Sequence, residues 1–421
     1  MRLILISPKF PFENEESRAR VIKNYLRELS ERHNFEIILV FVSNENIEGK
    51  KIPDYVHKFY HLPQPRFFTQ VINILIYSVI MGKYPIQSML FWSARNHRMV
   101  KKIVKEHQAE VVMTELIRTT QFRIKEDNIL VCDLADLFSI RYRDQLRNVD
   151  SIDKIQGQYD TKSIGIFKRL IDNKFIKKLI LGMEYRLVRK TEKRLPSLFD
   201  ATTLVSPVEV KALKELTARN NIFWVPNGTD PAREDDIKIH EKNSYTICFL
   251  GILEVPHNEE AVLYFVKEVF PLIKEKIPQV TLSIIGKKPS KAILRACSLH
   301  EEIKVLGFVD DLKAEIRKAD VFVCPIKSGS GVQTKLFEAM KNGIPIVTAS
   351  IAAQGIVYQD EEPFMIADDP EEFADACSQL LENSSLRNTY AKRGFDVVSQ
   401  HYFWENAGNK LNAVIQGQLK D

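Results

Sequence analysis

The chain of 421 residues has few cysteines, and their arrangement suggests neither a bridge nor a metal site. The five cysteines are odd in number, widely spaced and mostly set in apolar, strand-like runs: Cys132, Cys248, Cys297, Cys324 and Cys377. This pattern excludes a disulfide framework and a cysteine zinc site, and it indicates a reducing compartment.

A long uninterrupted apolar run is also missing. The most apolar segment, Val71 to Met81, is 11 residues long and is interrupted by Asn73, whereas a membrane-spanning helix needs about 20 apolar residues. We therefore predict a core or interfacial helix there. The N-terminus leads directly into the apolar run Leu3 to Ile6, without the basic start and cleavage site of a signal peptide. We expect the protein to stay in the cytoplasm.

The net charge of +5 is unevenly distributed. Residues 1–235 carry 39 Lys and Arg against 29 Asp and Glu, and the remainder carries 21 against 26. The chain is only mildly basic and has no nucleic-acid recognition motif, so nucleic acid is not expected as a partner. Much of the positive excess lies between Lys162 and Arg194, where basic and apolar residues alternate. Such a stretch fits either contact with an anionic membrane or a solvated basic face over a buried stripe.

The length suits two domains of about 200 residues each. Apolar strand-like runs alternate with helical patterns in both halves, which indicates parallel sheets covered by helices on both faces. We therefore predict the α/β class, with two doubly wound, Rossmann-like domains. Pro226, Gly228 and the polar residues up to Asn243 mark the join between them.

The most informative stretch, Pro325 to Met340, joins an apolar strand, a glycine loop and a helix start. Gly329 and Gly331 can take positive φ and let the backbone approach a ligand. The helix is predicted to begin near Val332, and its unpaired N–H groups and dipole favour an anion. Lys335 adds a cation in the first turn, which is unfavourable unless an anion lies there. The stretch therefore predicts a diphosphate site.

Glu338 lies one turn after Lys335, near the same face of the predicted helix. Its carboxylate can accept hydrogen bonds from a sugar diol beside the phosphates. A second explanation stays open, in which the glycines serve an ordinary strand-to-helix turn and Lys335 and Glu338 form a solvated ion pair.

Over nearly its whole length the chain resembles glycosyltransferases of the GT-B architecture, in the large retaining group called glycosyltransferase family 4. The second half carries the strongest motifs, which together are specific. They are Val225-Pro226-Asn227-Gly228 with Asp230, Phe249-Leu250-Gly251 followed by Pro256, Asn258 and Ala261, Gly307-Phe308-Val309 with Asp311, and Ser328 to Met340. In the first half, Cys132 to Ser139 and Val205 to Glu209 resemble a subset whose members elongate bacterial surface polysaccharides.

The resemblance implies two domains that face each other across a cleft and bind different substrates. The N-terminal domain, 1–226, would bind the acceptor, and a C-terminal helix at about 402–421 would pack back on it. The C-terminal domain, 227–401, would bind a nucleoside diphosphate sugar. The implied reaction is a retaining transfer of the hexosyltransferase type to a glycan or lipid-linked acceptor. Its implied setting is bacterial surface polysaccharide synthesis at the inner face of the plasma membrane.

The resemblance also assigns the donor residues. It places the diphosphate over Gly331, Val332 and Lys335, and the ribose hydroxyls on Glu338. The strand end at Phe308 and Val309 would lie near the base. The complete predicted donor site is Gly251, Asn258, Phe308, Val309, Ser328, Gly329, Ser330, Gly331, Val332, Lys335 and Glu338. Lys335 is also a predicted catalytic residue, because N–H groups and one lysine can neutralise a leaving diphosphate without metal. We expect neither a metal nor a cofactor.

Asp133 and Asp136, at a strand end of the first half, are the other predicted catalytic residues, and Arg18 is the predicted residue on the acceptor side. Each has an alternative role that stays open. Asp133 or Asp136 could serve as a helix N-cap, and Arg18 could lie on a helix surface. Two carboxylates without further ligands give little support for a metal.

Two departures from the family pattern leave a second hypothesis open. Ser330 stands where many relatives carry the first of two glutamates, and the histidine that relatives have near the reaction centre has no obvious equivalent. The chain could therefore be a catalytically decayed subunit that binds a nucleotide sugar within a polysaccharide-biosynthesis complex. An epimerase or a phosphorylase on the same architecture is a third hypothesis, although no motif for a phosphorylase cofactor lysine is present.

Overall fold

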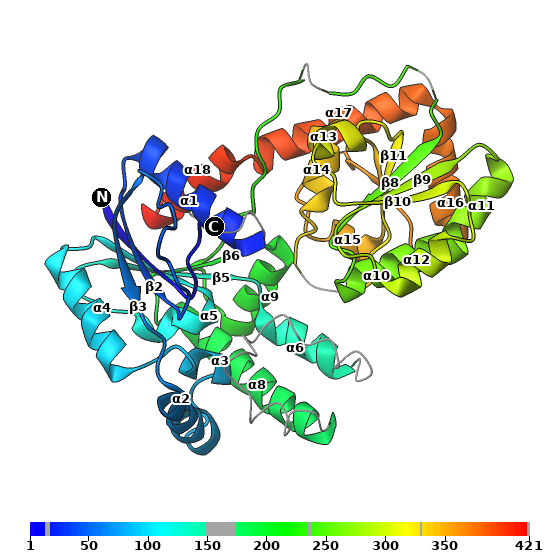
Figure 1. Cartoon of the computed structure of the whole chain (residues 1–421). Helices are drawn as coiled ribbons and strands as arrows, with labels where there is room; N and C mark the ends of the chain where they lie inside the picture. The colour runs from blue at the N-terminus through cyan, green and yellow to red at the C-terminus, as the bar shows by residue number, and fades with distance from the viewer. Residues whose placement is uncertain are drawn as a thin grey trace. The chain divides into compact units, whose positions relative to one another are not determined.

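The computed structural model describes residues 1–12, 17–147, 174–234, 237–241, 243–328, 331–359 and 361–418 of the chain. The chain forms two compact units (Figure 1): unit 1 contains Met1–Pro226 and Ala407–Asp421, and unit 2 contains Asn227–Asn406. The chain returns to unit 1 within its last helix, α18 (Trp404–Ile415). Among the described residues, no helix has both the length and the apolar character that crossing a bilayer requires.

Unit 1 is built on a seven-stranded sheet in which every pairing between neighbouring strands is parallel. The strands, in spatial order, are β3 (Val56–Leu62), β2 (Glu36–Val42), β1 (Arg2–Ser7), β4 (Val111–Glu115), β5 (Ile129–Ala135), β6 (Ala201–Leu204) and β7 (Ile222–Trp224). Strands β1, β2, β4 and β5 are buried over nearly their whole length, as expected where helices cover both faces of a parallel sheet.

Two helices of unit 1, α4 and α9, begin at recognisable capping residues. The side chain of Ser93 accepts a hydrogen bond from the N–H of Asn96 at the start of α4, and Ser206 caps α9 before a proline. The helical segments are α1 (Ser17–His33), α2 (Phe67–Asn73), the π-helix η1 (Ile74–Ile80), α3 (Ile86–Met89), α4 (Ala94–Glu106), α5 (Leu116–Thr119), η2 (Thr120–Phe122), α6 (Phe138–Arg147), α8 (Lys174–Arg194), η5 (Leu195–Ser197), α9 (Pro207–Thr217) and α18.

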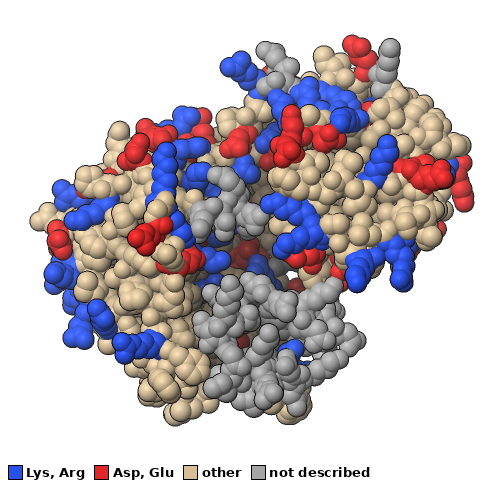
Figure 2. All heavy atoms as spheres, in the orientation of Figure 1, with Lys and Arg blue, Asp and Glu red and all other residues tan. Residues whose placement is uncertain are grey.

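The structure bears on two segments that were predicted from the sequence of unit 1. The apolar segment Val71 to Met81 belongs to α2 and η1, which follow one another directly, and it is not a core helix because most of its large apolar side chains are exposed. Its surface is mostly tan at the position of α2 in Figure 2. The basic stretch from Lys162 to Arg194 is described from residue 174 onward, as α8, and its earlier part lies outside the described residues.

Unit 2 repeats the design with a six-stranded sheet, again paired in parallel throughout. In spatial order the strands are β10 (Ile303–Gly307), β9 (Thr281–Ile285), β8 (Thr246–Leu250), β11 (Val321–Cys324), β12 (Ile346–Thr348) and β13 (Met365–Ile366). The helical segments are α10 (Pro256–Tyr264), η7 (Phe265–Val269), α11 (Phe270–Lys276), α12 (Lys291–Cys297), α13 (Leu312–Ile316), α14 (Lys335–Lys341), α15 (Ser350–Ala353), α16 (Pro370–Glu382) and α17 (Ser384–His401). The predicted α/β class with two doubly wound, Rossmann-like units is confirmed.

The helix after the glycine loop starts later than predicted. We expected it to begin near Val332, but α14 begins at Lys335, after Thr334 as its N-cap. Gly331 has φ +86°, as its glycine identity allows. The chain needs the residues from Gly331 to Thr334 to turn before the helix can start, and Lys335 thereby becomes the first helical residue.

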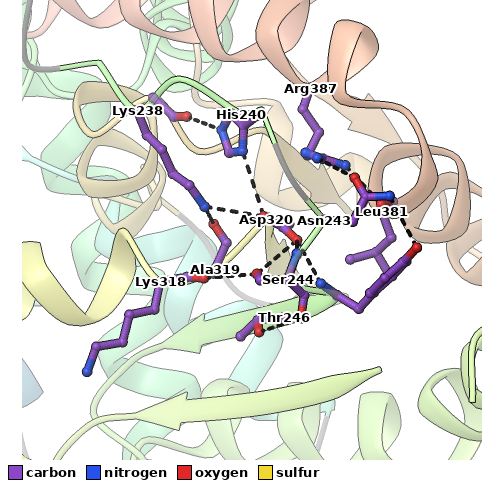
Figure 3. Close-up of polar contacts among 12 residues, drawn as sticks. Lys238, His240, Asn243, Ser244, Thr246, Lys318, Ala319, Asp320, Leu381 and Arg387 are labelled. Atoms are coloured by element: carbon purple, nitrogen blue, oxygen red, sulfur yellow. Dashed lines mark hydrogen bonds and ion pairs between the residues drawn. The ribbon is translucent and has the colours of Figure 1, made fainter. Parts of the chain in front are cut away.

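A buried aspartate fixes the segment that leads into β8 (Figure 3). One carboxylate oxygen of Asp320 accepts hydrogen bonds from the backbone N–H groups of Ser244 (2.6 Å) and Tyr245 (2.8 Å). Its other oxygen lies 3.3 Å from Lys238 Nζ and 3.9 Å from the ring of His240. Burial alone would raise the pKa of Asp320, but the His240 ring, the charge of Lys238 and the hydrogen bonds of Ser244 together hold this pKa well below its usual value.

Asp320→Asn should lower the free energy of unfolding of unit 2 by about 3 kcal/mol at neutral pH, because it leaves Lys238 beside a neutral partner. The pKa of Asp320 is lower in the folded than in the unfolded protein. Its stabilisation is therefore fully present above the unfolded value of about 4 and is lost as the pH falls below it. Thermal unfolding at several pH values should show the gap between wild type and variant closing on acidification. Asp310, an exposed aspartate of the same unit, changed to Asn, is the control, and an equal loss there would contradict this assignment.

Three buried glutamates connect α8 and α9 to the starts of other helices. Glu184 of α8 accepts hydrogen bonds from two backbone N–H groups at the start of α3, at 2.7 and 3.2 Å. Glu192 of α8 and Glu209 of α9 accept from the N–H groups of Ser139 and Leu137, both at 3.1 Å, at the start of α6. Burial raises the pKa of Glu184 and of Glu192 to about 7 each. Burial and the nearby charge of Asp136 raise the pKa of Glu209 to about 8.

Unit 1 should therefore lose stability as the pH rises from about 4.5 to 8, because the folded state holds protons on these glutamates that the unfolded state releases. Glu209→Gln keeps an acceptor for the N–H of Leu137 and removes the charge. We expect this variant to melt at a higher temperature than wild type at pH 8 and to differ little from it at pH 5. If the difference in melting temperature between the variant and wild type is the same at pH 5 and pH 8, Glu209 does not titrate in this range.

Candidate functional site

Glycines close the carboxyl ends of three neighbouring strands of unit 2. Gly251 follows β8, Gly286 follows β9, and Gly307 ends β10. A Cβ on Gly286 would lie only 1.7 Å from the carbonyl oxygen of Gly251, and Gly286 itself has φ +150°. Its N–H donates to the carbonyl of Gly307 at 2.8 Å. The ends of β8 and β9 are thus packed closely against one another, at the end of a parallel sheet where such folds bind ligands.

Next to these glycines, Lys335 is held in place by Asn258. Its Nζ donates to Asn258 Oδ1 and lies 4.8 Å from the centre of the Phe249 ring. Asn258 is buried, and its amide also donates to the carbonyl of Ile252 at 3.0 Å. A Cβ on Gly251 would meet the Asn258 side chain at 2.9 Å, so the glycine makes room for it.

The charge of Lys335 has no anionic partner among the described residues, where no carboxylate lies within 4.0 Å of its ammonium group. Burial lowers the pKa of Lys335 below the usual value for a lysine, and the neighbouring Cys324 opposes this effect only in part. A partly buried cation at the first position of a helix is suited to an anion such as a phosphate. The described contacts do not include the solvated pair of Lys335 and Glu338 that the sequence left open.

Glu338 instead pairs with Lys341. Glu338 Oε2 lies 2.8 Å from Lys341 Nζ, and Glu338 Oε1 accepts a hydrogen bond of 3.2 Å from the hydroxyl of Thr229. Lys341 also donates to this hydroxyl at 3.1 Å. The carboxylate is therefore fixed on one face of α14 and remains about one fifth exposed, so it can still accept from a hydroxyl of a ligand.

The remaining predicted donor residues differ in their exposure and contacts. Phe308 is 64% exposed, with the ammonium of Lys287 4.9 Å from its ring centre, and Val309 is half-buried. Val332 packs against Gly355, and a Cβ added to Gly355 would come within 3.1 Å of Val332. The hydroxyl of Ser328 donates to Glu260 at 3.1 Å. Gly331 is described, and the predicted residues Gly329 and Ser330 lie outside the described residues.

Unit 1 has its own polar cluster at the carboxyl ends of β4 and β5. Arg18, in the first turn of α1, donates to Asp133 and, through Nε at 3.2 Å, to Glu115. Glu115 and Asp133 are buried. Burial lowers the pKa of the Arg18 guanidinium, but the charges of Asp133 and Glu115 outweigh this effect and raise it overall. Burial also raises the pKa of Glu115, which the charge of Arg18 opposes.

The contacts of this cluster differ from the structural roles that the sequence left open for Arg18, Asp133 and Asp136. Arg18 does not lie on a helix surface, since its side chain bridges two carboxylates and is 20% exposed. Asp133 accepts from Arg18 and from the N–H of Ala135 (3.1 Å), and Asp136 pairs with Arg141 at 3.2 Å. Neither aspartate acts as an N-cap, because Glu209 and Glu192 take the N–H groups at the start of α6.

Glu115 and Gly286 lie at these two sites but were not predicted from the sequence. Glu115 ends β4 directly before Leu116, which has φ +61°, and Ala135 at the end of β5 has the same φ. Two non-glycine residues with this backbone conformation on neighbouring strand ends are uncommon, and such strain gathers at functional sites. A glycine directly after the apolar run of β9 was a visible signal for Gly286, whereas no local pattern marks Glu115.

The comparisons with known proteins agree with this geometry. The family model "Glycosyl transferases group 1" matches residues 244–383, which covers most of unit 2. An uncharacterized 44.6 kDa protein in the cps region of Klebsiella pneumoniae is 24% identical over 298 residues, or 68% of this chain and 73% of that protein. A phosphatidyl-myo-inositol mannosyltransferase of Mycobacterium leprae is 32% identical over 176 residues, which span 41% of this chain and 46% of that enzyme.

A likeness to solved structures extends over the whole chain. The crystal structure of HepE from Anabaena in complex with UDP-glucose superimposes with a TM-score of 0.57 at 14% identity and covers 99% of both chains. At this identity the likeness shows the fold, which is GT-B. Residues 244–383 of this glycosyltransferase thus match the group 1 glycosyl transferases, and the chain as a whole has the GT-B fold.

Proposed function

We propose that this glycosyltransferase moves a sugar, with retention of configuration, from a nucleoside diphosphate sugar to a glycan or lipid-linked acceptor in bacterial surface polysaccharide synthesis. The observation that carries the donor half of this proposal is the charge of Lys335. It is partly buried, is oriented by Asn258, and has no carboxylate partner among the described residues. A diphosphate would supply the missing negative charge.

The donor would bind along the carboxyl edge of the unit 2 sheet. Glu338 would accept from the ribose hydroxyls with the oxygen that now takes the Thr229 hydroxyl. As the bond to the sugar breaks, negative charge grows on the leaving diphosphate. The ammonium of Lys335 would stabilise that charge, so that the transfer requires neither a metal nor a cofactor.

The acceptor would bind to unit 1 near Arg18, Glu115 and Asp133. Two buried carboxylates can hold the hydroxyl of an acceptor by accepting its proton in a hydrogen bond, and Arg18 keeps both of them in place. The role in surface polysaccharides is supported by the cps-region relative, and a lipid-linked acceptor by the phosphatidyl-myo-inositol mannosyltransferase. The inner face of the plasma membrane is the site that such an acceptor implies.

Lys335→Ala should lower transfer by about 100-fold to 1,000-fold, the usual effect of removing one group that stabilises charge in a transition state. Glu338→Ala should weaken donor binding and lower transfer less. Both variants should fold, which their circular dichroism and melting temperatures would check. Lys327→Ala is the matched control, because this exposed lysine comes just before the glycine loop and lies over the Tyr264 ring. Full activity of a Lys335→Ala/Glu338→Ala double variant with its proper donor would refute the site.

A panel of nucleoside diphosphate sugars should contain at least one that stabilises the protein. A ligand at about 100 times its dissociation constant adds roughly 2.7 kcal/mol to the free energy of unfolding, which a shift in melting temperature would report. A decayed, binding-only subunit would show the same shift without turnover. Release of free nucleoside diphosphate from the stabilising donor, with or without an acceptor, separates the enzyme from that alternative. Stabilisation by no donor at all would speak against the proposal.

A further inference from the structure

In the helical segment formed by α2 and η1, apolar side chains face outward and polar side chains face unit 1, which is the reverse of the usual arrangement on a globular protein. Its outer face carries a stripe of exposed apolar side chains at helical spacing: Phe68 (79% exposed), Ile72 (55%), Leu75 (51%), Val79 (50%), Ile80 (71%) and Met81 (51%). Its inner face contributes the buried polar residues Asn73 and Ser78. Asn73 donates to the backbone carbonyl of Trp92 at 2.7 Å, and Gln70 to that of Leu90 at 3.1 Å. Side-chain hydrogen bonds thus hold the helix on unit 1. Its apolar side, which a globular protein normally buries, faces outward.

The sequence around this helix contains no negative charge. Between Asp54 and Glu106 there are eight Lys or Arg residues and no Asp or Glu. Arg66 precedes α2, and Lys83 follows η1; both are exposed. Lys83 also lines a cavity of about 370 Å³ together with Arg123, next to Tyr77 of η1. The exposed apolar stripe therefore has an exposed cation shortly before it and another shortly after it in the sequence.

Helix α8 extends the same surface. Lys190 of α8 donates to the carbonyl of Gly82, directly after η1, at 2.9 Å, and Figure 1 shows α2 and α8 along the same side of unit 1. Leu179 of α8 is 66% exposed, and Lys178 beside it is exposed as well. The two acidic residues of α8 are the buried glutamates described above. Neither of the two adjacent helices exposes a carboxylate in its described part.

We propose that the outer face of α2 and η1, with the adjacent end of α8, is a membrane-docking face that inserts its apolar stripe into an anionic bilayer. A helix with one apolar face, cationic surroundings and insufficient length to span lies in the plane of the membrane interface. Its lysines and arginines then meet the lipid phosphates. A second copy of the chain fits this face poorly, because a symmetric contact would bring the cations of one copy against those of the other. The inference does not depend on which donor or acceptor the enzyme uses.

Co-sedimentation of the full-length protein with lipid vesicles tests the proposal. We expect binding to vesicles that contain about one third phosphatidylglycerol, and little binding to pure phosphatidylcholine vesicles. Leu75→Asn/Ile80→Asn should weaken binding at least about tenfold, because it removes two inserted side chains. Lys83→Gln/Lys178→Gln should weaken it to a smaller extent and reduce its dependence on salt. The matched control is Leu294→Asn/Leu299→Asn, which changes two exposed leucines of unit 2 and should bind as wild type does.

A fluorescent label provides a test that does not depend on a destabilised variant. All five native cysteines are buried, so Val79→Cys gives one accessible thiol for an environment-sensitive dye. Its emission should shift to the blue on phosphatidylglycerol vesicles and be quenched by spin labels on the acyl chains.

Four results would overturn the proposal: no binding of wild type to anionic vesicles, equal binding to neutral ones, unchanged binding of Leu75→Asn/Ile80→Asn, or a label that stays in water. A dimer that this variant abolishes would also overturn it, since the face would then be covered by a second copy. Donor-induced thermal stabilisation should be the same in wild type and variant. Failure of the docking proposal and failure of the donor site are therefore distinguishable.

Discussion

The parallel pairing of the strands is the constraint on which both sites depend. Each sheet has all its carboxyl ends at one edge, and in each the strand order reverses beside the first strand, between β1 and β4 in unit 1 and between β8 and β11 in unit 2. Loops on either side of such a reversal run in opposite directions and leave a crevice. Arg18 follows β1 and Glu115 ends β4, while Asn258 follows β8 and Lys335 follows β11. The two polar clusters therefore occupy equivalent places in two separately folded sheets.

The two clusters differ in how their charge is balanced. In unit 1, the guanidinium of Arg18 lies between two buried carboxylates, so the described groups carry one more negative than positive charge when all are ionised. In unit 2, the ammonium of Lys335 is held by the neutral amide of Asn258. The first arrangement is suited to hydroxyl groups and the second to an anion. This difference in charge is the physical basis for placing the acceptor on unit 1 and the diphosphate on unit 2 in the proposed reaction.

Sequence patterns were sufficient where the signal is local. Apolar strand-like runs alternating with helical patterns predicted the two parallel sheets, and the glycine loop pointed to Lys335. They were insufficient where the outcome depends on contacts between distant residues: Arg18 meets Asp133 from 115 positions away, and nothing beside Glu115 indicates its partner. Strand β3 was missed because it is an edge strand with several exposed side chains. Hydropathy identified the apolar segment of α2 and η1 but did not predict that its apolar side faces outward. That orientation depends on the tertiary contacts that bury Asn73 and Ser78.

The central claim is that Lys335 is a cation positioned for the diphosphate of the donor. Calorimetric titration of a nucleoside diphosphate and of the matching nucleoside tests it most directly, in wild type and in Lys335→Met. We expect wild type to bind the diphosphate at least tenfold more tightly than the nucleoside, and the variant to lose most of this preference while its affinity for the nucleoside stays the same. An unchanged preference in Lys335→Met would contradict the account, because the diphosphate would then be bound elsewhere.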